Sequence, residues 1–293
     1  MTKIKHPVLK YPGSKWRLAD KIISIMPPHR SYLEPFFGSG AVFFKKPPSR
    51  IETINDLDGE IVNLFRCIRE YPEELMRVVA CTPYARGEYE QAYGHFKAGG
   101  QARPDGVEAA RLTLVRYWQS HGSTVTYKCG WKNDRVGREY AYDVHYWRNL
   151  PEWISDAAER LKAAQIEQCP ALDVIRRFNH PDVLIYADPP YMLSTRRRKQ
   201  YLVEMADDMQ HVELLEALKA HAGPVILSGY DNALYDSLLQ GWNKLQWSAQ
   251  AEGGAPRTET VWCNFETKFT GERHENHCDY EQQRRRRKDC HRL

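Results

Sequence analysis

Hydrophobic and polar positions along the chain predict short buried strands and amphipathic helices. The run Val183 to Ala187 has no polar alternation, which is typical of a central strand buried on both faces. Pro189 and Pro190 follow it and end the strand, because proline cannot donate a backbone hydrogen bond. Val225 to Ser228 predicts a second strand of the same kind.

Helices and strands alternate over the first eighty residues. Leu18, Ile22 and Ile25 share one side of a helix predicted from Trp16 to Met26. Such alternation predicts a parallel, doubly wound α/β sheet. The other elements expected here are strands at Ser31 to Glu34 and Arg50 to Ile54, and helices at Ala41 to Lys45, Ile61 to Ile68 and Glu73 to Val79.

The alternation stops between about Thr82 and Pro151, where a helix is predicted only from Val107 to Gln119. A long irregular region inside an α/β chain is more typical of an inserted module than of a loop. The pattern resumes with a helix from Glu152 to Ala164. Further on we expect a helix capped by Asp207 or Asp208, and an antiparallel hairpin of Lys244 to Ala249 with Glu259 to Phe265.

Charge and cysteine content narrow the class of protein. The 293 residues carry a net charge of only +4, but the stretch from Arg111 to Arg148 holds seven basic and three acidic residues. Seven scattered cysteines without a CxxC pair favour a reducing, intracellular compartment. We find no apolar signal core and no run of about 20 apolar residues, so we expect a soluble protein. After Gly271 the chain is polar and strongly basic, and we expect a solvated, disordered tail.

The tetrad Asp188-Pro189-Pro190-Tyr191 restricts the chemistry most. It lies at the carboxyl end of a strand, where open α/β sheets bind their ligands. A carboxylate, a proline-fixed carbonyl and an aromatic face together suit a flat ring that bears an amine. We infer an extruded nucleobase as the target. The alternative is a structural Pro-Pro turn in which the aspartate caps the next helix.

The turn Phe36-x-Gly38-x-Gly40 suggests a second ligand. Glycines between a strand and a helix allow a ligand to approach the backbone at the helix start. Glu34 ends the preceding strand and Asp56 ends the next one, where an acid can accept hydrogen bonds from ribose hydroxyls. A nucleoside with a small charged group fits this pattern, and S-adenosylmethionine is such a ligand. The alternative is tight helix–strand packing without a ligand.

Four motifs together resemble the Dam-type, class alpha DNA adenine-N6 methyltransferases. They occur in the order and rough spacing of that family, and the similarity covers about residues 7 to 268. The motifs are Lys10 to Trp16, Leu33 to Gly40, Ile54 to Asp56, and Asp188 to Tyr191.

The resemblance implies roles and a division of the chain. Tyr11 and Lys15 would help to close the cofactor site, Asp56 would hold the cofactor ribose, and Asp188 would lie between cofactor and base. The expected fold is a Rossmann-like methyltransferase sheet with an inserted, mainly helical target-recognition module and a basic C-terminal tail. The expected parts are a cofactor-binding half (1–81), the insertion (82–151), a catalytic half (152–270) and the tail (271–293). The segment from Arg257 to Asn264 resembles the family's closing hairpin.

The mechanism follows from the weak nucleophilicity of an adenine amine, whose lone pair is delocalised into the ring. Hydrogen bonds to the Asp188 carboxylate and the Pro189 carbonyl would favour a pyramidal nitrogen and stabilise positive charge that develops on it. An ordinary carboxylate is too weak to deprotonate the neutral amine beforehand. Tyr191 would stack on the base, which must leave the duplex to be reached.

Basic residues of the insertion and of the segment after the tetrad are candidates for binding double-stranded DNA. Arginine and lysine can clamp phosphates, and interleaved aromatic residues can fill the stack where a base leaves. The alternatives are a small aromatic core with a solvated rim and an ordinary solvated charge run. The candidates are Arg116, Lys132, Arg196, Arg197, Arg198 and Lys199.

Several other readings remain open. The competing functions are cytosine-N4 methylation, methylation of RNA or of protein glutamine, and an inactive DNA-binding relative. We expect no metal, because the His and Cys residues of the tail fit no standard zinc spacing. We expect location in the cytoplasm of a bacterial or phage-infected cell, near the nucleoid. A cognate restriction endonuclease is a candidate partner, and no obligate protein partner is inferred.

Overall fold

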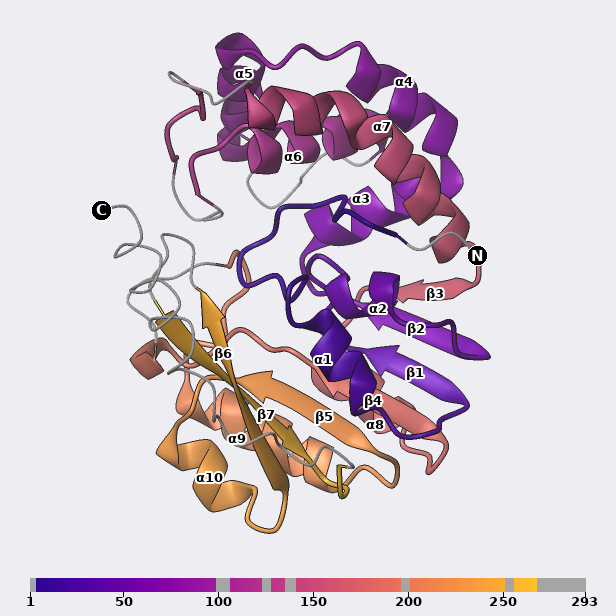
Figure 1. Ribbon diagram of the computed structural model, residues 1–293, viewed down its shortest axis with the longest axis vertical. Helices are drawn as coiled ribbons and strands as arrows, with labels where there is room; N and C mark the ends of the chain where they lie inside the picture. The colour runs from indigo at the N-terminus through magenta and orange to yellow at the C-terminus, as the bar shows by residue number, and fades with distance from the viewer. Residues whose placement is uncertain are drawn as a thin grey trace, which may run out of the picture.

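The computed structural model describes residues 4–98, 106–122, 128–134, 141–195, 201–250 and 256–267. A seven-stranded sheet has the order β3-β2-β1-β4-β5-β7-β6 (Figure 1). The first five strands in this order are parallel, and β7 is antiparallel to both β5 and β6. The strands are β1 (Ser31–Glu34), β2 (Ile51–Asn55), β3 (Ala164–Glu167), β4 (Val183–Ala187), β5 (Val225–Gly229), β6 (Asn243–Gln250) and β7 (Pro256–Cys263).

Helices cover both faces of this sheet, as expected for a doubly wound fold. Leu184 and Tyr186 of β4 join a core shared with α1, α2 and α3, whereas Ile185 and Ala187 join a core shared with α8, α9 and α10. Every residue of β4 is buried, which confirms the central strand predicted from its apolar run. The helices are α1 (Ala19–Ser24), α2 (Ala41–Lys45), α3 (Gly59–Glu70), α8 (Ala171–Arg177), α9 (Asp208–Lys219) and α10 (Ala233–Leu238), and a 3₁₀ turn, η1, spans Leu193–Thr195.

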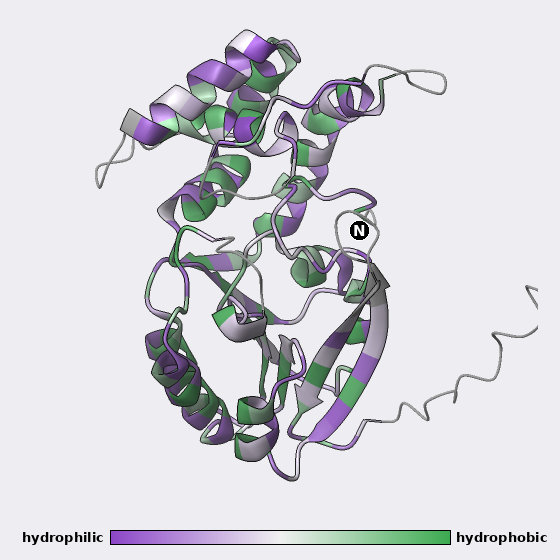
Figure 2. Ribbon diagram, turned by 90° about the vertical axis from the view of Figure 1, so that its left-hand side faces the viewer, coloured by the Kyte–Doolittle hydropathy of each residue, from purple (hydrophilic) through white to green (hydrophobic). Residues whose placement is uncertain are grey.

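A group of helices stands beyond the β3 side of the sheet (Figure 1). It consists of α4 (Pro72–Ala80), α5 (Arg86–Ala98), α6 (Val107–Trp118) and α7 (Tyr142–Leu161). Helix α4 packs on α6 and α7, α5 packs on α6, and α3 joins the group to the sheet. In Figure 2 hydrophobic and hydrophilic residues alternate along these helices, as expected for helices that bury one side each.

Three features differ from the sequence prediction. Helix α5 was not expected, and α7 begins at Tyr142 rather than at Glu152. The proposed boundary at residue 151 therefore falls inside a continuous helix. Helix α1 is shorter than its apolar pattern suggested, because Trp16 to Leu18 form a turn before it.

The predicted cap of α9 and the closing hairpin are confirmed. Asp207 accepts a hydrogen bond from the Met209 amide, and Gln210 completes a capping box. Strands β6 and β7 pair antiparallel over their whole length. Within the described ranges, the longest and most apolar helices still fall short of a membrane span.

Candidate active site

A pocket opens at the carboxyl ends of β1, β2 and β4, where the sequence predicted one. Its walls come from the loop before α1, the turns after β1 and β2, and the start of the tetrad after β4. All seven residues predicted to contact a cofactor line it: Tyr11, Lys15, Glu34, Phe36, Gly38, Asp56 and Asp188. Of the other tetrad residues Pro190 also lines the pocket, whereas Pro189 and Tyr191 are not among its lining residues and Tyr191 is 7% exposed.

Backbone amides hold the Asp56 carboxylate at the tip of β2. The Gly38 amide donates to Oδ2 at 2.8 Å, and the Asp58 amide donates to Oδ1 at 2.9 Å. Burial raises the pKa of Asp56, although these backbone donors partly offset the effect. The carboxylate is thus fixed against the glycine turn, where it can accept further hydrogen bonds from a ligand.

Glu34 is a second buried acid in this pocket, with 2% of its surface exposed. The Tyr32 hydroxyl donates to its Oε2 at 2.8 Å. Burial raises the pKa of Glu34 to about 8, and the nearby Asp188 charge adds to the increase. In this position the carboxyl group can accept hydrogen bonds from a ligand or bind a positively charged group.

Tyr11 covers the glycine turn. Gly38 has φ of +50°, and a Cβ at this position would lie 3.0 Å from the Tyr11 ring. The Tyr11 ring packs 5.7 Å from Tyr117 of α6 and 5.8 Å from Tyr201, measured between centroids. Tyr11, from the loop before α1, is therefore packed against the helical group.

Two side chains of the tetrad, Asp188 and Tyr191, form a polar cluster with Lys15 and Glu259. Lys15 Nζ lies 3.0 Å from Asp188 Oδ2 and 3.3 Å from Glu259 Oε1. The Tyr191 hydroxyl donates to Glu259 Oε1 and lies 3.1 Å from Asp188 Oδ1. Burial disfavours charge on Lys15, but the two carboxylates outweigh it and raise the pKa of this ammonium. The lysine therefore stays charged and binds both acids.

Glu259 was not among the predicted site residues. It reaches the cluster because β7 pairs with β5, whose Gly229 lies opposite Thr260. The sequence did contain a signal, since Glu259 alternates with Val261 and Cys263 on one face of a strand. An acid on an otherwise apolar strand face is typical of a buried, partnered charge.

The family assignment rests on most of the chain. The sequence model of the D12 class N6 adenine-specific DNA methyltransferases matches residues 11–252. The chain belongs to this family. Its members methylate the N6 amine of adenine in DNA with S-adenosylmethionine as methyl donor, and so does this protein.

Individual relatives are distant in sequence. The chain is similar to a type II methyltransferase of Lactococcus lactis subsp. cremoris, with 23% identity over 85% of this chain and 89% of the relative. It is also similar to the DNA adenine methylase of Haemophilus influenzae, with 26% identity over 64% of this chain and 65% of that protein. The DNA adenine methylase of Escherichia coli K12 is 24% identical over 77% of this chain and 81% of its own length.

The residues of the pocket fit the cofactor of a D12 methyltransferase. Asp56 presents a fixed carboxylate that suits two ribose hydroxyls, and Glu34 suits a positively charged group. Phe36 and Leu172 add apolar walls that suit the adenine ring. S-adenosylmethionine supplies a methyl group that is activated by attachment to a positively charged sulfur.

The structure buries Arg116, which was predicted to contact DNA, and leaves Lys132 partly exposed. Arg116 is 5% exposed, pairs with Glu60 of α3 and lies over the Phe96 ring at 3.9 Å. This position argues against contact with DNA. Lys132 is partly exposed and pairs with Asp143 at 2.9 Å. Arg196, Arg197, Arg198 and Lys199 lie outside the described residues.

Aromatic residues of the helical group form a core, which was the alternative to DNA contact. Tyr117, Trp118 and Trp147 are each at most 5% exposed. The indole nitrogens of Trp118 and Trp147 donate to the backbone oxygens of Val8 and Thr82. These three residues therefore support packing, whereas Tyr142 remains 40% exposed.

Proposed function

We propose that this D12 methyltransferase acts on an adenine that has rotated out of a specific double-stranded sequence into the pocket beside Asp188. The observation that carries the proposal is that Asp188 lines the same pocket as Asp56 and Gly38. One ligand held by the glycine turn would therefore reach the tetrad. The base must leave the helix, because its amine cannot be attacked inside a duplex.

The residues of the tetrad would activate and position the amine. Asp188 and the Pro189 carbonyl would accept hydrogen bonds from its two hydrogens, which would favour a pyramidal nitrogen and localise the lone pair. The cofactor, held by Asp56 and Glu34, would supply the methyl carbon, and its sulfur would keep the electron pair of the broken carbon–sulfur bond as the amine nitrogen bonds to that carbon. The methylated nitrogen is then a strong acid, so Asp188 or water can accept one proton from it. The tetrad stabilises the positive charge that exists between these events.

Tyr191 would supply the surface on which the adenine stacks. Its position is fixed by the Glu259 contact and by Tyr230, whose ring meets it edge-on with centroids 4.5 Å apart. Stacking of a base on an aromatic side chain contributes about 1–3 kcal/mol. A fixed ring loses little further freedom when the base arrives, which favours capture of the extruded nucleotide.

Sequencing of DNA from a methylation-deficient bacterial host that expresses this chain tests the proposal. We expect N6-methyladenine at one short sequence context in double-stranded DNA. Unmodified DNA, together with tight cofactor and DNA binding by the purified protein, would instead support an inactive relative. Modified cytosine or modified RNA would identify a different amine as the target.

The Asp56→Ala variant tests the cofactor assignment. We expect the cofactor dissociation constant to rise about 10- to 100-fold, since hydrogen bonds to a charged group contribute about 1.5–3 kcal/mol. DNA affinity should change much less. Isothermal titration with each ligand measures both, and Asp20→Ala, which alters an exposed acid on α1, is the control. A variant that loses DNA affinity more than cofactor affinity would contradict the ribose assignment.

We also propose cytoplasmic location with association with the nucleoid, because the substrate is DNA. A cognate restriction endonuclease is a further proposal, since one relative is named a type II methyltransferase. The two proposals are separable. An endonuclease activity in the source cell that cuts the same sequence only when it is unmethylated would support a restriction partner.

A further inference from the structure

One ammonium group lies between two carboxylates beside the tetrad. The side chains of Lys15, Asp188 and Glu259 are 6%, 18% and 7% exposed, and Lys15 also donates to the Gly13 carbonyl at 2.8 Å. With both acids ionised, this cluster carries one net negative charge. Because the three side chains are largely buried, solvent screens this charge weakly, and the distribution of charge among the three groups matters.

We propose that Glu259 is a positioning residue for methyl transfer, which shares the charge of Lys15 and holds the Tyr191 hydroxyl so that Asp188 remains a full acceptor for the amine. The inference deepens the proposed function and rests on it. Glu259 comes from β7, far from the tetrad in sequence, and is brought there by the register of β7 on β5.

The first part of the inference concerns charge. A lysine paired with Asp188 alone would neutralise the carboxylate that must stabilise positive charge on the amine. A second carboxylate 3.3 Å from the same Nζ leaves the cluster negative as the nitrogen–carbon bond forms and the carbon–sulfur bond breaks. Lys15 can then orient Asp188 without cancelling its effect on the developing cation.

The second part concerns one proton. The Tyr191 hydroxyl has a single hydrogen, and both Glu259 Oε1 and Asp188 Oδ1 lie within its reach. When Glu259 accepts the hydrogen bond from this hydroxyl, Asp188 Oδ1 remains available to the amine. Without the Glu259 acceptor, the hydroxyl would donate to Asp188 and compete with the substrate for the same oxygen.

Titration of Glu259 provides a readout that a purely structural role would not change. Burial raises the pKa of Glu259, and the Asp188 charge adds to this, while Lys15 and Tyr191 oppose it. Activity should therefore fall as the pH drops through this raised pKa, because protonation removes the second carboxylate. The ionisable groups that face Glu259 are Lys15 from the loop before α1, Tyr186 on β4, and Asp188 and Tyr191 after β4.

The test is single-turnover methylation of DNA across a pH series by the full chain with saturating cofactor. Glu259→Gln keeps the shape and the acceptor oxygen but removes the charge, and Glu259→Asp keeps the charge. We expect Glu259→Gln to lower the maximal rate about 10-fold or more, with little change in either dissociation constant, and to lack the acid limb seen in wild type. Glu259→Asp should retain that limb. Glu266→Gln, an exposed acid just beyond β7, should behave as wild type.

Two results would overturn the inference. One is a Glu259→Gln protein with the wild-type rate, and the other is an unchanged acid limb in that variant. If Glu259→Gln does not fold, as judged by thermal melting, loss of the acid limb in Glu259→Asp would equally contradict the proposal. Asp188→Ala is assayed in parallel. An active Asp188→Ala protein would refute the proposed function itself, whereas failure of the Glu259 variants alone would refute only this inference.

Discussion

Replacement of Asp188 by alanine is expected to abolish methyl transfer while the protein still folds and binds DNA. The change removes the carboxylate that accepts a hydrogen from the amine and faces the developing positive charge. Loss of one preorganised electrostatic group costs about 10²–10³-fold in rate, and we expect at least the upper value here. Single-turnover methylation of DNA from a methylation-deficient host measures the effect.

The matched control is Asp182→Ala, at the opposite end of the same strand. Asp182 is exposed and precedes β4, whereas Asp188 follows it, so both variants remove an acid that flanks one buried strand. The control should keep the wild-type rate. An Asp188→Ala protein with wild-type turnover would rule out the proposed role of the tetrad. If the Asp188→Ala protein is inactive because it no longer binds cofactor, the loss of activity reports on cofactor binding and not on the methyl-transfer step.

The sequence could predict the pocket because parallel strands end at one edge of a sheet. Glu34 ends β1, Asp56 directly follows β2 and Asp188 directly follows β4, and these three strands are parallel neighbours, so strand order alone brings their turns together. No knowledge of side-chain packing is needed for this step. The glycine turn adds a local requirement, since Gly38 adopts a positive φ and lies against the Tyr11 ring.

Glu259 could not be placed by the same argument. Its position depends on how far β7 slides along β5, and one residue of slip would turn its side chain to the other face. The apolar neighbours Val261 and Cys263 indicate that the acid is buried but not which charge it meets. Contact with Lys15, which is distant in sequence, appears only in three dimensions.

Arg116 and helix α5 show why the helical group was harder to predict from the sequence than the sheet. Arg116 counts as a basic residue in sequence, but Glu60 on another helix neutralises it in the interior. Tyr89, Ala92 and Tyr93 are buried at helical spacing, but Gly87 and Gly94 interrupt the apolar pattern of α5. Helix α7 continues through Pro151 because buried residues on both sides, among them Leu150 and Trp153, hold it in place.

Among the variants proposed, Glu52→Gln is expected to lower the free energy of unfolding most. Glu52 is 1% exposed at the start of β2 and accepts hydrogen bonds from Lys46 and from Arg160 of α7, the latter at 2.8 Å to Oε1. The Ser49 amide donates to the same oxygen at 3.0 Å. Removal of one partner from a buried ion pair costs about 3–5 kcal/mol, because the remaining charges lose their compensation. Denaturant unfolding measures the change.

The pH dependence of this loss follows from the charge of Glu52. Burial alone would raise its pKa, but the hydrogen bonds from Arg160 and Lys46 outweigh burial and hold the pKa below its usual value. The stabilisation is therefore complete above the unfolded pKa of about 4.3 and is lost as the pH falls through the folded-state pKa. Wild type and Glu52→Gln should converge in stability only in that acid range.

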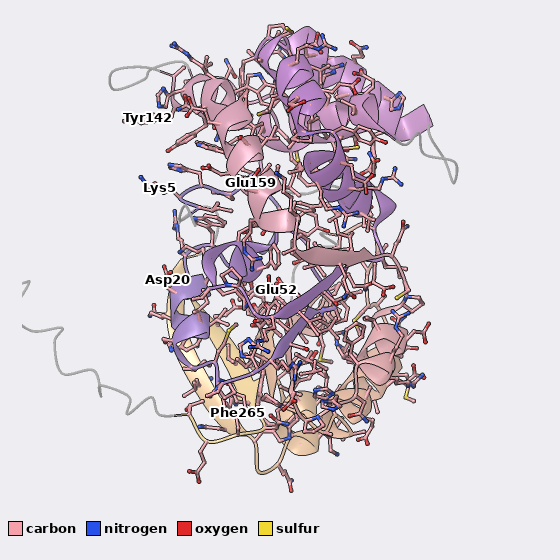
Figure 3. The ribbon with its side chains drawn as sticks, turned by 90° about the vertical axis from the view of Figure 1, so that its right-hand side faces the viewer. Lys5, Asp20, Glu52, Tyr142, Glu159 and Phe265 are labelled. Carbon is pink, nitrogen blue, oxygen red and sulfur yellow. The ribbon has the colours of Figure 1, made fainter. Side chains whose placement is uncertain are left out.

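Glu159→Gln provides the control on the same helix that supplies Arg160. Glu159 is 72% exposed and pairs only with Lys162 one turn away among the described residues, whereas Glu52 lies inside the molecule (Figure 3). An exposed pair contributes about 0–1 kcal/mol, so this variant should unfold almost as wild type does. Equal losses of unfolding free energy in the two variants would mean that the buried ion pairs of Glu52 with Lys46 and Arg160 do not join α7 to the sheet. A large loss for Glu52 alone would show that the helical group is anchored to the sheet through this charge.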